Sequence, residues 1–222
     1  MGEMVRLKAA DGHEFDAYKA VPSERPKGGI CVIQEIFGVN AHIKEVADGF
    51  AADGYLVIAP AVYDRAEPGA NLGYTPEDMQ AGRDLRAKVG DDGPVMDIAA
   101  TVKKLQSAGN VGTVGYCWGG TLSFLASTRI EGVSASVVYY GGQIVPYKGE
   151  TVRVPLQMHF GDMDAGIPME DVNQIKEAQP QADVHVYHAD HGFNCDHRSQ
   201  YDENSCNLAR ERTLAFFREH VG

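Results

Sequence analysis

The chain has 222 residues, of which 44% are hydrophobic and 23% charged, an ordinary composition for one globular domain with a well-buried core, here residues 1–222. Its formal net charge is −11, which argues against nucleic acid as a partner, because nucleic-acid-binding proteins normally present a basic face. No apolar run approaches the length of a membrane-spanning helix, so we expect no membrane partner either.

The start of the chain and the cysteines both indicate a cytoplasmic protein. Acidic residues occur early in the N-terminal segment, which lacks the apolar core of a signal peptide. The four cysteines are too few and too unevenly spaced for a disulfide framework, so we expect free thiols in a reducing compartment. They are Cys31, Cys117, Cys195 and Cys206.

The first half of the chain predicts strands followed by helices. Asp11-Gly12 is a hairpin signal between two short strands, and Asn40 and Gly54 mark the two ends of an amphipathic helix. Thr75-Pro76 marks the start of another helix. In chain order, the predicted elements are strands at 5–10, 13–20 and 28–36, a helix at 40–54, a strand at 55–60, a Gly/Pro-rich loop at 61–74, and helices at 75–89 and 94–109.

The second half continues the alternation. It predicts a strand at 111–116, a helix at 120–128, strands at 134–141 and 155–160, a helix at 169–179, a strand at 183–189 and a helix at 206–221. Strands separated by helices indicate a mostly parallel sheet covered by helices on both faces. In such sheets the chemistry lies in loops beyond the carboxyl ends of the strands. Four candidate residues follow predicted strands in this way: Glu35, Cys117, Asp164 and His191.

A cysteine stands between glycines at the junction of the strand 111–116 with the helix that follows it. Gly115-x-Cys117-x-Gly119 has the spacing of a nucleophile elbow, with sulfur in place of the usual serine oxygen. The turn is sharp and strained, and only very small side chains fit two residues before and after the nucleophile. The helix N-terminus beyond it favours both a thiolate and an oxyanion. The alternative is a buried structural cysteine at a strand end.

An elbow nucleophile needs an imidazole base and an acid that orients it, in the chain order nucleophile, acid, base. Asp164 lies in the loop after the strand 155–160, with Asp162 as the competing acid, and His191 lies in the loop after the strand 183–189. We therefore expect Cys117, Asp164 and His191 to form a triad. His188 and His197 are the other histidines near this loop, whereas His159 is expected in the core.

The loop Gln34–Asn40, which follows the first central strand, should supply the second N–H group of an oxyanion hole. Glu35 in this loop is unusual, because an acid at the end of a buried β-branched run is usually paired or functional. The alternative is an ordinary acid at a strand end.

Four segments together resemble the dienelactone hydrolase family, the cysteine-dependent carboxymethylenebutenolidases with the α/β-hydrolase fold. They are Q-E-I-F-G-V-N, G-Y-C-W-G-G, G-x-x-D-x-x-I-P and H-G-F, and the resemblance covers nearly the whole chain. It implies that Cys117 is the nucleophile, His191 the base and Asp164 the orienting acid. It also implies an oxyanion hole formed by the N–H groups of Ile36 and Trp118.

The resemblance further implies that Glu35 is an extra carboxylate that keeps the resting thiol protonated and helps to ionise it once substrate is bound. The implied substrate is a small anionic lactone, dienelactone, which is hydrolysed to maleylacetate without a cofactor. Family members hold the substrate carboxylate with arginines, one of them four residues after the catalytic histidine, where this chain has Cys195. The substrate-binding candidates here are Arg83, Arg86, Arg198 and Phe37.

Three other functions stay open at this stage. The chain could be a related cysteine hydrolase for another ester, lactone or thioester, because the elbow does not define specificity. It could bind a metal through His188, His191, Cys195 and His197, although this spacing is not a recognised zinc pattern and would remove the triad's base, so we expect no metal. It could also be a scaffold with an inactive elbow. The sequence leaves a monomer and a small homo-oligomer equally open.

Overall fold

The computed structural model describes residues 2–222, and its strands form one eight-stranded sheet. The strands are β1 (Glu3–Lys8), β2 (Glu14–Ala20), β3 (Gly29–Ile33), β4 (Leu56–Pro60), β5 (Val111–Tyr116), β6 (Ala135–Tyr139), β7 (Leu156–Gly161) and β8 (Asp183–Tyr187). The helices are α1 (Ala41–Ala52), α2 (Pro76–Val89), α3 (Asp92–Leu105), α4 (Trp118–Arg129), α5 (Met169–Ala178) and α6 (Glu203–His220), with 3-10 turns η1 (Val62–Arg65), η2 (Gln106–Ala108) and η3 (Val145–Tyr147). Every predicted strand and helix therefore has a counterpart.

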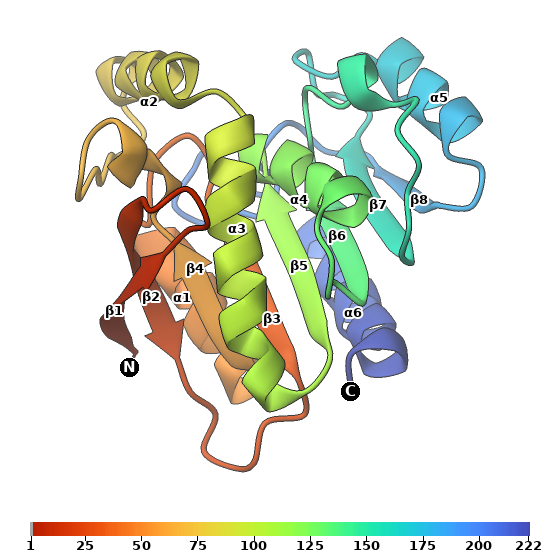
Figure 1. Ribbon diagram of the computed structural model, residues 1–222. Helices are drawn as coiled ribbons and strands as arrows, with labels where there is room; N and C mark the ends of the chain where they lie inside the picture. Colours follow the sequence, from red (N-terminus) through yellow and green to blue (C-terminus); the bar gives the residue numbers. More distant parts are fainter. Residues whose placement is uncertain (1) are drawn as a thin grey trace.

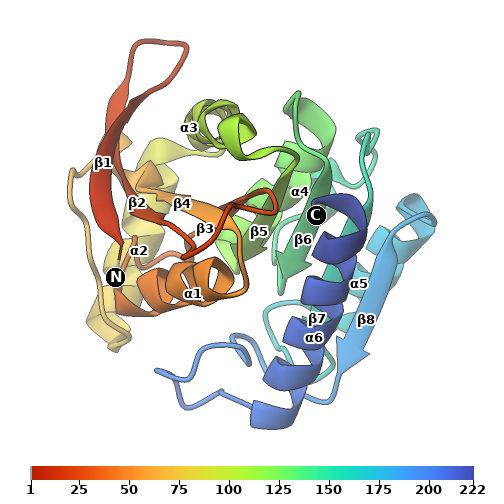
Figure 2. The same cartoon turned by 90° about the horizontal axis from the view of Figure 1, so that it is seen from below.

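The strand order is β1-β2-β4-β3-β5-β6-β7-β8, and the strands from β4 to β8 in that order are parallel. The hairpin of β1 and β2 adds two antiparallel strands at one edge. Helices α3 and α4 cover one face of the sheet and α1 and α6 the other (Figures 1 and 2). The predicted parallel sheet with helices on both faces is thus confirmed.

Burial follows the position of each strand in the sheet. Every residue of β3, β5, β6 and β7 is buried, as expected for strands with helices on both sides, and this explains their continuous apolar sequences. The edge strand β8 is largely accessible. The carboxyl ends of the parallel strands lie at the upper end of the sheet in Figure 1, where α2 is seen at the upper left. The candidate residues converge at this end.

Three predicted boundaries needed correction. β3 ends at Ile33 rather than at 36, which places Gln34 and Glu35 in the following loop. α6 begins at Glu203 instead of 206, because the Asp202 side chain caps it by accepting a hydrogen bond of 2.7 Å from the Ser205 N–H. The predicted loop 61–74 contains the 3-10 turn η1. Within residues 2–222, no helix combines the length and the apolar character that a membrane span requires.

Candidate active site

The turn between β5 and α4 holds Cys117 in a strained conformation that matches the elbow expected from the sequence. Its φ is 56° and its ψ −120°, in the region that non-glycine residues rarely adopt. A Cβ at Gly115 would lie 1.8 Å from the Gly119 carbonyl oxygen, and a Cβ at Gly119 would lie 2.4 Å from the carbonyl oxygens of β3 and its loop. Both positions therefore require glycine, and the turn presents Cys117 at the N-terminus of α4.

His191 and Asp164 face each other beside this cysteine. The His191 Nδ1 atom lies 2.7 Å from Asp164 Oδ2, and the other Asp164 oxygen accepts a hydrogen bond from the Gly166 N–H. The Asp164 side chain is fully buried. The competing acid Asp162 is more exposed and contacts His188, 3.1 Å away. The structure therefore brings Asp164, and not Asp162, to His191.

The electrostatic surroundings of His191 favour its protonated form. Burial alone would lower its pKa, but a charged sulfur at Cys117 and the Asp164 carboxylate raise the pKa of His191 to about 10. A hydrogen bond between Cys117 and His191 contributes in the same direction. An imidazole with these partners can take a proton from the thiol and hold it as part of an ion pair.

The two backbone N–H groups expected to form the oxyanion hole belong to Trp118 and Ile36. Trp118 is the first residue of α4, so its N–H has no acceptor within the helix. The Gln34 side chain donates a 3.3 Å hydrogen bond to the Glu35 carbonyl, which orients the peptide group that carries the Ile36 N–H. The Tyr63 hydroxyl donates to the Ile36 carbonyl, 3.2 Å away. These contacts fix the loop opposite the helix N-terminus.

The Trp118 side chain packs within the protein. Its ring stacks on Tyr63 with centroids 5.3 Å apart, and its indole N–H donates to Asp91 at 2.7 Å. The Arg86 guanidinium lies 5.9 Å from the Trp118 ring and donates a short hydrogen bond to the Gln143 side chain. Arg86 therefore reaches the side of the elbow that faces α2.

Arg83 is exposed one helical turn before Arg86, and both line a cavity of about 320 Å³. Among residues 2–222, no hydrogen bond or ion pair joins Arg83 to another candidate residue. Asp91, which accepts the hydrogen bond from the Trp118 indole, lines the same cavity.

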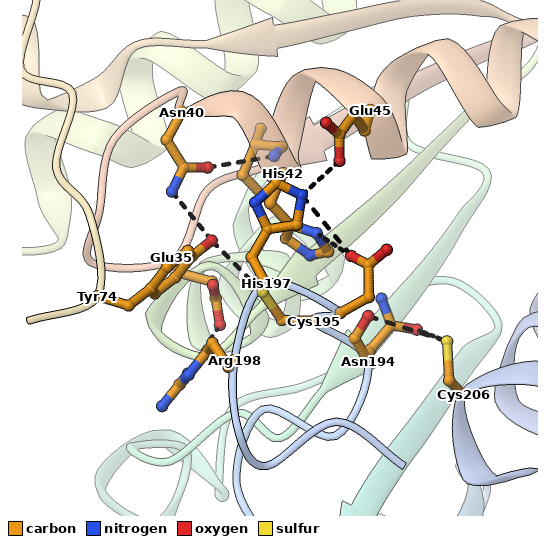
Figure 3. A network of polar contacts seen from close by, with 12 residues as sticks. Glu35, Asn40, His42, Glu45, Tyr74, Asn194, Cys195, His197, Arg198 and Cys206 are labelled. Atoms are coloured by element: carbon orange, nitrogen blue, oxygen red, sulfur yellow. Dashed lines mark hydrogen bonds and ion pairs between the residues drawn. The ribbon is translucent and has the colours of Figure 1, made fainter. Parts of the chain in front are cut away.

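Glu35 is buried and lies opposite Arg198. Its Oε1 atom is 3.4 Å from Arg198 Nη1, and its Oε2 atom has no hydrogen-bond partner within residues 2–222 (Figure 3). The Arg198 side chain is only 12% exposed, and its guanidinium lies 5.7 Å from the Phe37 ring and 5.9 Å from the Tyr74 ring. The Glu35 carboxylate, which has one oxygen without a hydrogen-bond partner, thus lies beside the largely buried Arg198 guanidinium.

Cys195 occupies the position at which the family resemblance implies an arginine. It is buried, and its thiol donates to the Tyr74 hydroxyl at 3.4 Å. Burial raises the pKa of Cys195 to about 11, so the thiol is neutral. Arg198, three residues later, provides the cation beside Glu35.

Tyr140 was missed by the sequence analysis. It follows β6 with a φ of 38°, its buried hydroxyl has no partner within residues 2–222, and its ring lies 5.1 Å from that of His191. A strained residue with an unsatisfied hydroxyl at the carboxyl end of a central strand is typical of a functional site. The signal in the sequence was Tyr140-Gly141-Gly142 at the end of the predicted strand 134–141.

The four residues considered as a metal site do not come together. His188 contacts Asp162, His191 contacts Asp164, and His197 contacts Glu45 at 2.7 Å. Cys195 points to Tyr74. This arrangement contradicts a metal site made of His188, His191, Cys195 and His197.

Comparisons with known proteins identify the relatives of this chain. The sequence model of the dienelactone hydrolase family matches residues 15–221. A carboxymethylenebutenolidase from Pseudomonas putida is 34% identical over 231 residues, which cover 96% of this chain and 95% of the relative. The crystal structure of a "Putative Dienelactone Hydrolase" from Klebsiella pneumoniae superposes with a TM-score of 0.87 at 28% identity, covering 99% of this chain and 100% of that one. The chain has the α/β-hydrolase fold and belongs to the dienelactone hydrolase family, enzymes that hydrolyse ester or lactone bonds.

Proposed function

We propose that the protein hydrolyses a small anionic lactone, dienelactone, to maleylacetate by way of a thioester on Cys117. The observation that carries this proposal is the alignment of an elbow cysteine with His191 and Asp164, which are joined by a 2.7 Å contact. The name of the Pseudomonas putida relative supports the choice of substrate. No cofactor is required by the chemistry.

In the first half of the reaction, His191 takes the thiol proton and the Cys117 sulfur attacks the lactone carbonyl carbon. The resulting oxyanion accepts hydrogen bonds from the N–H groups of Ile36 and Trp118, each worth about 3 kcal/mol in the transition state. The bond to the ring oxygen then breaks, and the stable enolate that leaves takes up the proton held by His191, which becomes neutral again. Because the leaving group stays tethered, the acyl-enzyme retains all the atoms of the lactone.

In the second half, His191 takes a proton from water, and the hydroxide attacks the thioester carbonyl. The carbon–sulfur bond breaks, the sulfur regains its proton from His191, and maleylacetate is released. Asp164 holds the imidazole in the required orientation throughout. One water molecule is consumed in each cycle.

Arg198 is the proposed partner of the substrate carboxylate. It is the buried cation nearest to Glu35, and the aromatic rings of Phe37 and Tyr74 flank it. A carboxylate that binds Arg198 competes with Glu35 for this guanidinium. Glu35 is then released toward the thiol and can accept its proton on the way to His191.

The decisive experiment compares the four cysteines. Cys117→Ala should abolish hydrolysis of both dienelactone and a neutral aryl ester, whereas Cys31→Ala, Cys195→Ala and Cys206→Ala should retain it. Near-normal turnover by Cys117→Ala would refute the mechanism. If Cys117→Ala loses aryl-ester hydrolysis and the wild type does not hydrolyse dienelactone at all, the mechanism stands and the proposed substrate is rejected.

Mass spectrometry tests the thioester directly. In His191→Gln, acylation should be slow but deacylation slower still, so that an adduct accumulates on Cys117. Because the lactone ring opens without losing atoms, the adduct should add the full mass of dienelactone to the chain. An adduct on another residue would contradict the proposal.

A further inference from the structure

A second group of chemically active side chains lies behind Glu35, where α1 meets the loop before α6. His42 and Glu45 come from α1, and Asp196 and His197 come from the loop (Figure 3). Each contributes one nitrogen or oxygen atom, and the four atoms lie within 4.8 Å of one another. None of these residues has a role in the proposed hydrolysis.

The spacing of the four residues follows from the fold. Residues three apart on a helix share one face, which brings His42 and Glu45 side by side. Asp196 and His197 are adjacent in the loop that also carries Arg198. Glu45 and His197 are 152 residues apart in the sequence, and their side chains make a 2.7 Å contact.

His42 is the residue whose surroundings point to a missing partner. It is only 3% exposed, and its Nδ1 atom lies 3.6 Å from Asp196 Oδ1, too far for a hydrogen bond. Its Nε2 atom has no partner within residues 2–222. Buried polar groups normally have partners.

Two of the distances between the ligand atoms are close to those of a tetrahedral metal site. Metal–ligand distances of about 2.0–2.2 Å require neighbouring ligand atoms to lie roughly 3.3 Å apart. The contact between His42 and Asp196 is 3.6 Å, and His197 Nε2 lies 3.8 Å from Asp196 Oδ1. Small rotations of the exposed side chains would bring the four ligand atoms to tetrahedral spacing. The His197 nitrogen that contacts Glu45 would lose its proton when it binds the metal.

We propose that His42, Glu45, Asp196 and His197 bind one divalent transition-metal ion, with Zn²⁺ as the best fit to two imidazoles and two carboxylates. Three of the four ligands are exposed, and the cluster borders an open cavity of about 250 Å³, so an ion can enter from solvent. The ion would clamp the loop to α1 directly beside Arg198. It would therefore act as a structural brace for the substrate-binding side of the active site.

The test measures zinc binding to the full-length protein. Chelator-treated wild type and Cys117→Ala are dialysed against Zn²⁺, and bound metal is counted by mass spectrometry. Both should bind one equivalent, because the catalytic thiol takes no part. Glu45→Gln and His197→Gln, which alter exposed residues and should fold, should bind roughly 10–100-fold more weakly. His188→Gln, an exposed histidine from the same end of the sheet, is the matched control and should bind like the wild type.

Two further measurements identify the site. Zn²⁺ at 100 times its dissociation constant should raise the melting temperature of the wild type by roughly 5–10 °C and that of His197→Gln by much less. Co²⁺ should show the visible absorption of a tetrahedral site without a near-ultraviolet thiolate band. Zinc binding that is equal in wild type, Glu45→Gln and His197→Gln, or a thiolate band with Co²⁺, would overturn the proposal.

Discussion

At the level of single residues, Glu35 has the most testable role. In the proposed mechanism the Glu35 carboxylate repels a negative charge on the Cys117 sulfur and accepts the thiol proton, and its Oε2 atom has no hydrogen-bond partner within residues 2–222. Glu35→Gln should therefore speed alkylation of the free enzyme by iodoacetamide at neutral pH. Turnover should fall by roughly 10²–10⁴, the contribution of a proton-transfer group. Asp162→Asn is the control and should change neither rate.

The two effects of Glu35→Gln have opposite signs, which separates a catalytic role from simple damage to the pocket. A damaged pocket would slow both reactions or disturb turnover alone. If alkylation and turnover both stay unchanged, Glu35 is only an acid at a strand end, and His191 activates Cys117 without it.

Arg198 is a second single residue with a testable role, because its guanidinium is proposed to bind the substrate carboxylate. Arg198→Ala should raise KM for dienelactone by about 10–100-fold, the equivalent of a charge-assisted hydrogen bond, and leave neutral aryl esters little affected. Arg83→Ala removes an exposed cation and should have little effect. Equal changes in KM for charged and neutral substrates would contradict carboxylate binding by Arg198.

At the level of elements, Arg65 joins three segments that the sheet alone does not hold together. It lies in η1, its guanidinium makes two 2.8 Å hydrogen bonds to the fully buried Asp97 carboxylate on α3, and it reaches Asp11 in the turn between β1 and β2. Arg65→Ala would leave a buried carboxylate unpaired. It should lower the free energy of unfolding by about 3–5 kcal/mol in urea titrations.

A matched control exists on the same hairpin. Arg6 pairs with Asp16 at 2.8 Å, but both side chains are exposed. Arg6→Ala should therefore lower the free energy of unfolding much less than Arg65→Ala does. Similar losses for Arg6→Ala and Arg65→Ala would show that burial of Asp97 adds nothing to this interaction.

At the level of the whole molecule, a buried histidine links stability to pH. His159 in β7 contacts Tyr187 at 2.8 Å, Gln157 at 3.0 Å and Thr213 at 3.2 Å, and burial lowers its pKa well below the ordinary value of 6.5. Below pH 6.5, His159 takes up a proton in the unfolded chain but stays neutral in the folded chain. Stability should thus be constant above pH 6.5 with respect to this group and fall as the pH drops further.

Urea unfolding between pH 5 and pH 8 measures this effect. His159 should contribute a loss of up to about 1.4 kcal/mol for each pH unit below 6.5. His159→Gln should reduce the slope, although it also lowers stability at all pH values. An unchanged slope in the variant would assign the acid sensitivity to other groups, of which buried His42 is the first candidate.

The sequence predicted those parts of the site that depend on local sterics. Gly115 and Gly119 predict the elbow because no side chain fits at either position, and this steric constraint lies within five consecutive residues. Local sterics alone do not separate Asp164, which we expected, from the competing Asp162, because both lie in one loop and only the direction of the chain after β7 separates them. The same holds for the candidate arginines, of which Arg198 alone reaches Glu35.

Long-range contacts were beyond prediction for the same reason. Nothing in the sequence of the helix that carries His42 indicates that the loop before α6 folds back onto α1. The strain at Tyr140 is likewise a property of the packed sheet, since its backbone turns where β6 passes between β5 and β7.

The strand order has a consequence for how activity is acquired as the protein folds. Cys117, Asp164 and His191 follow β5, β7 and β8, and β6 must pair between the first two before the groups can meet. No fragment with only local contacts can form the pocket, and parallel pairing is slow because each crossover must close first. Hydrolytic activity should consequently return later than helical circular dichroism during refolding. Recovered turnover then reports the docking of β8, the last strand of the sheet.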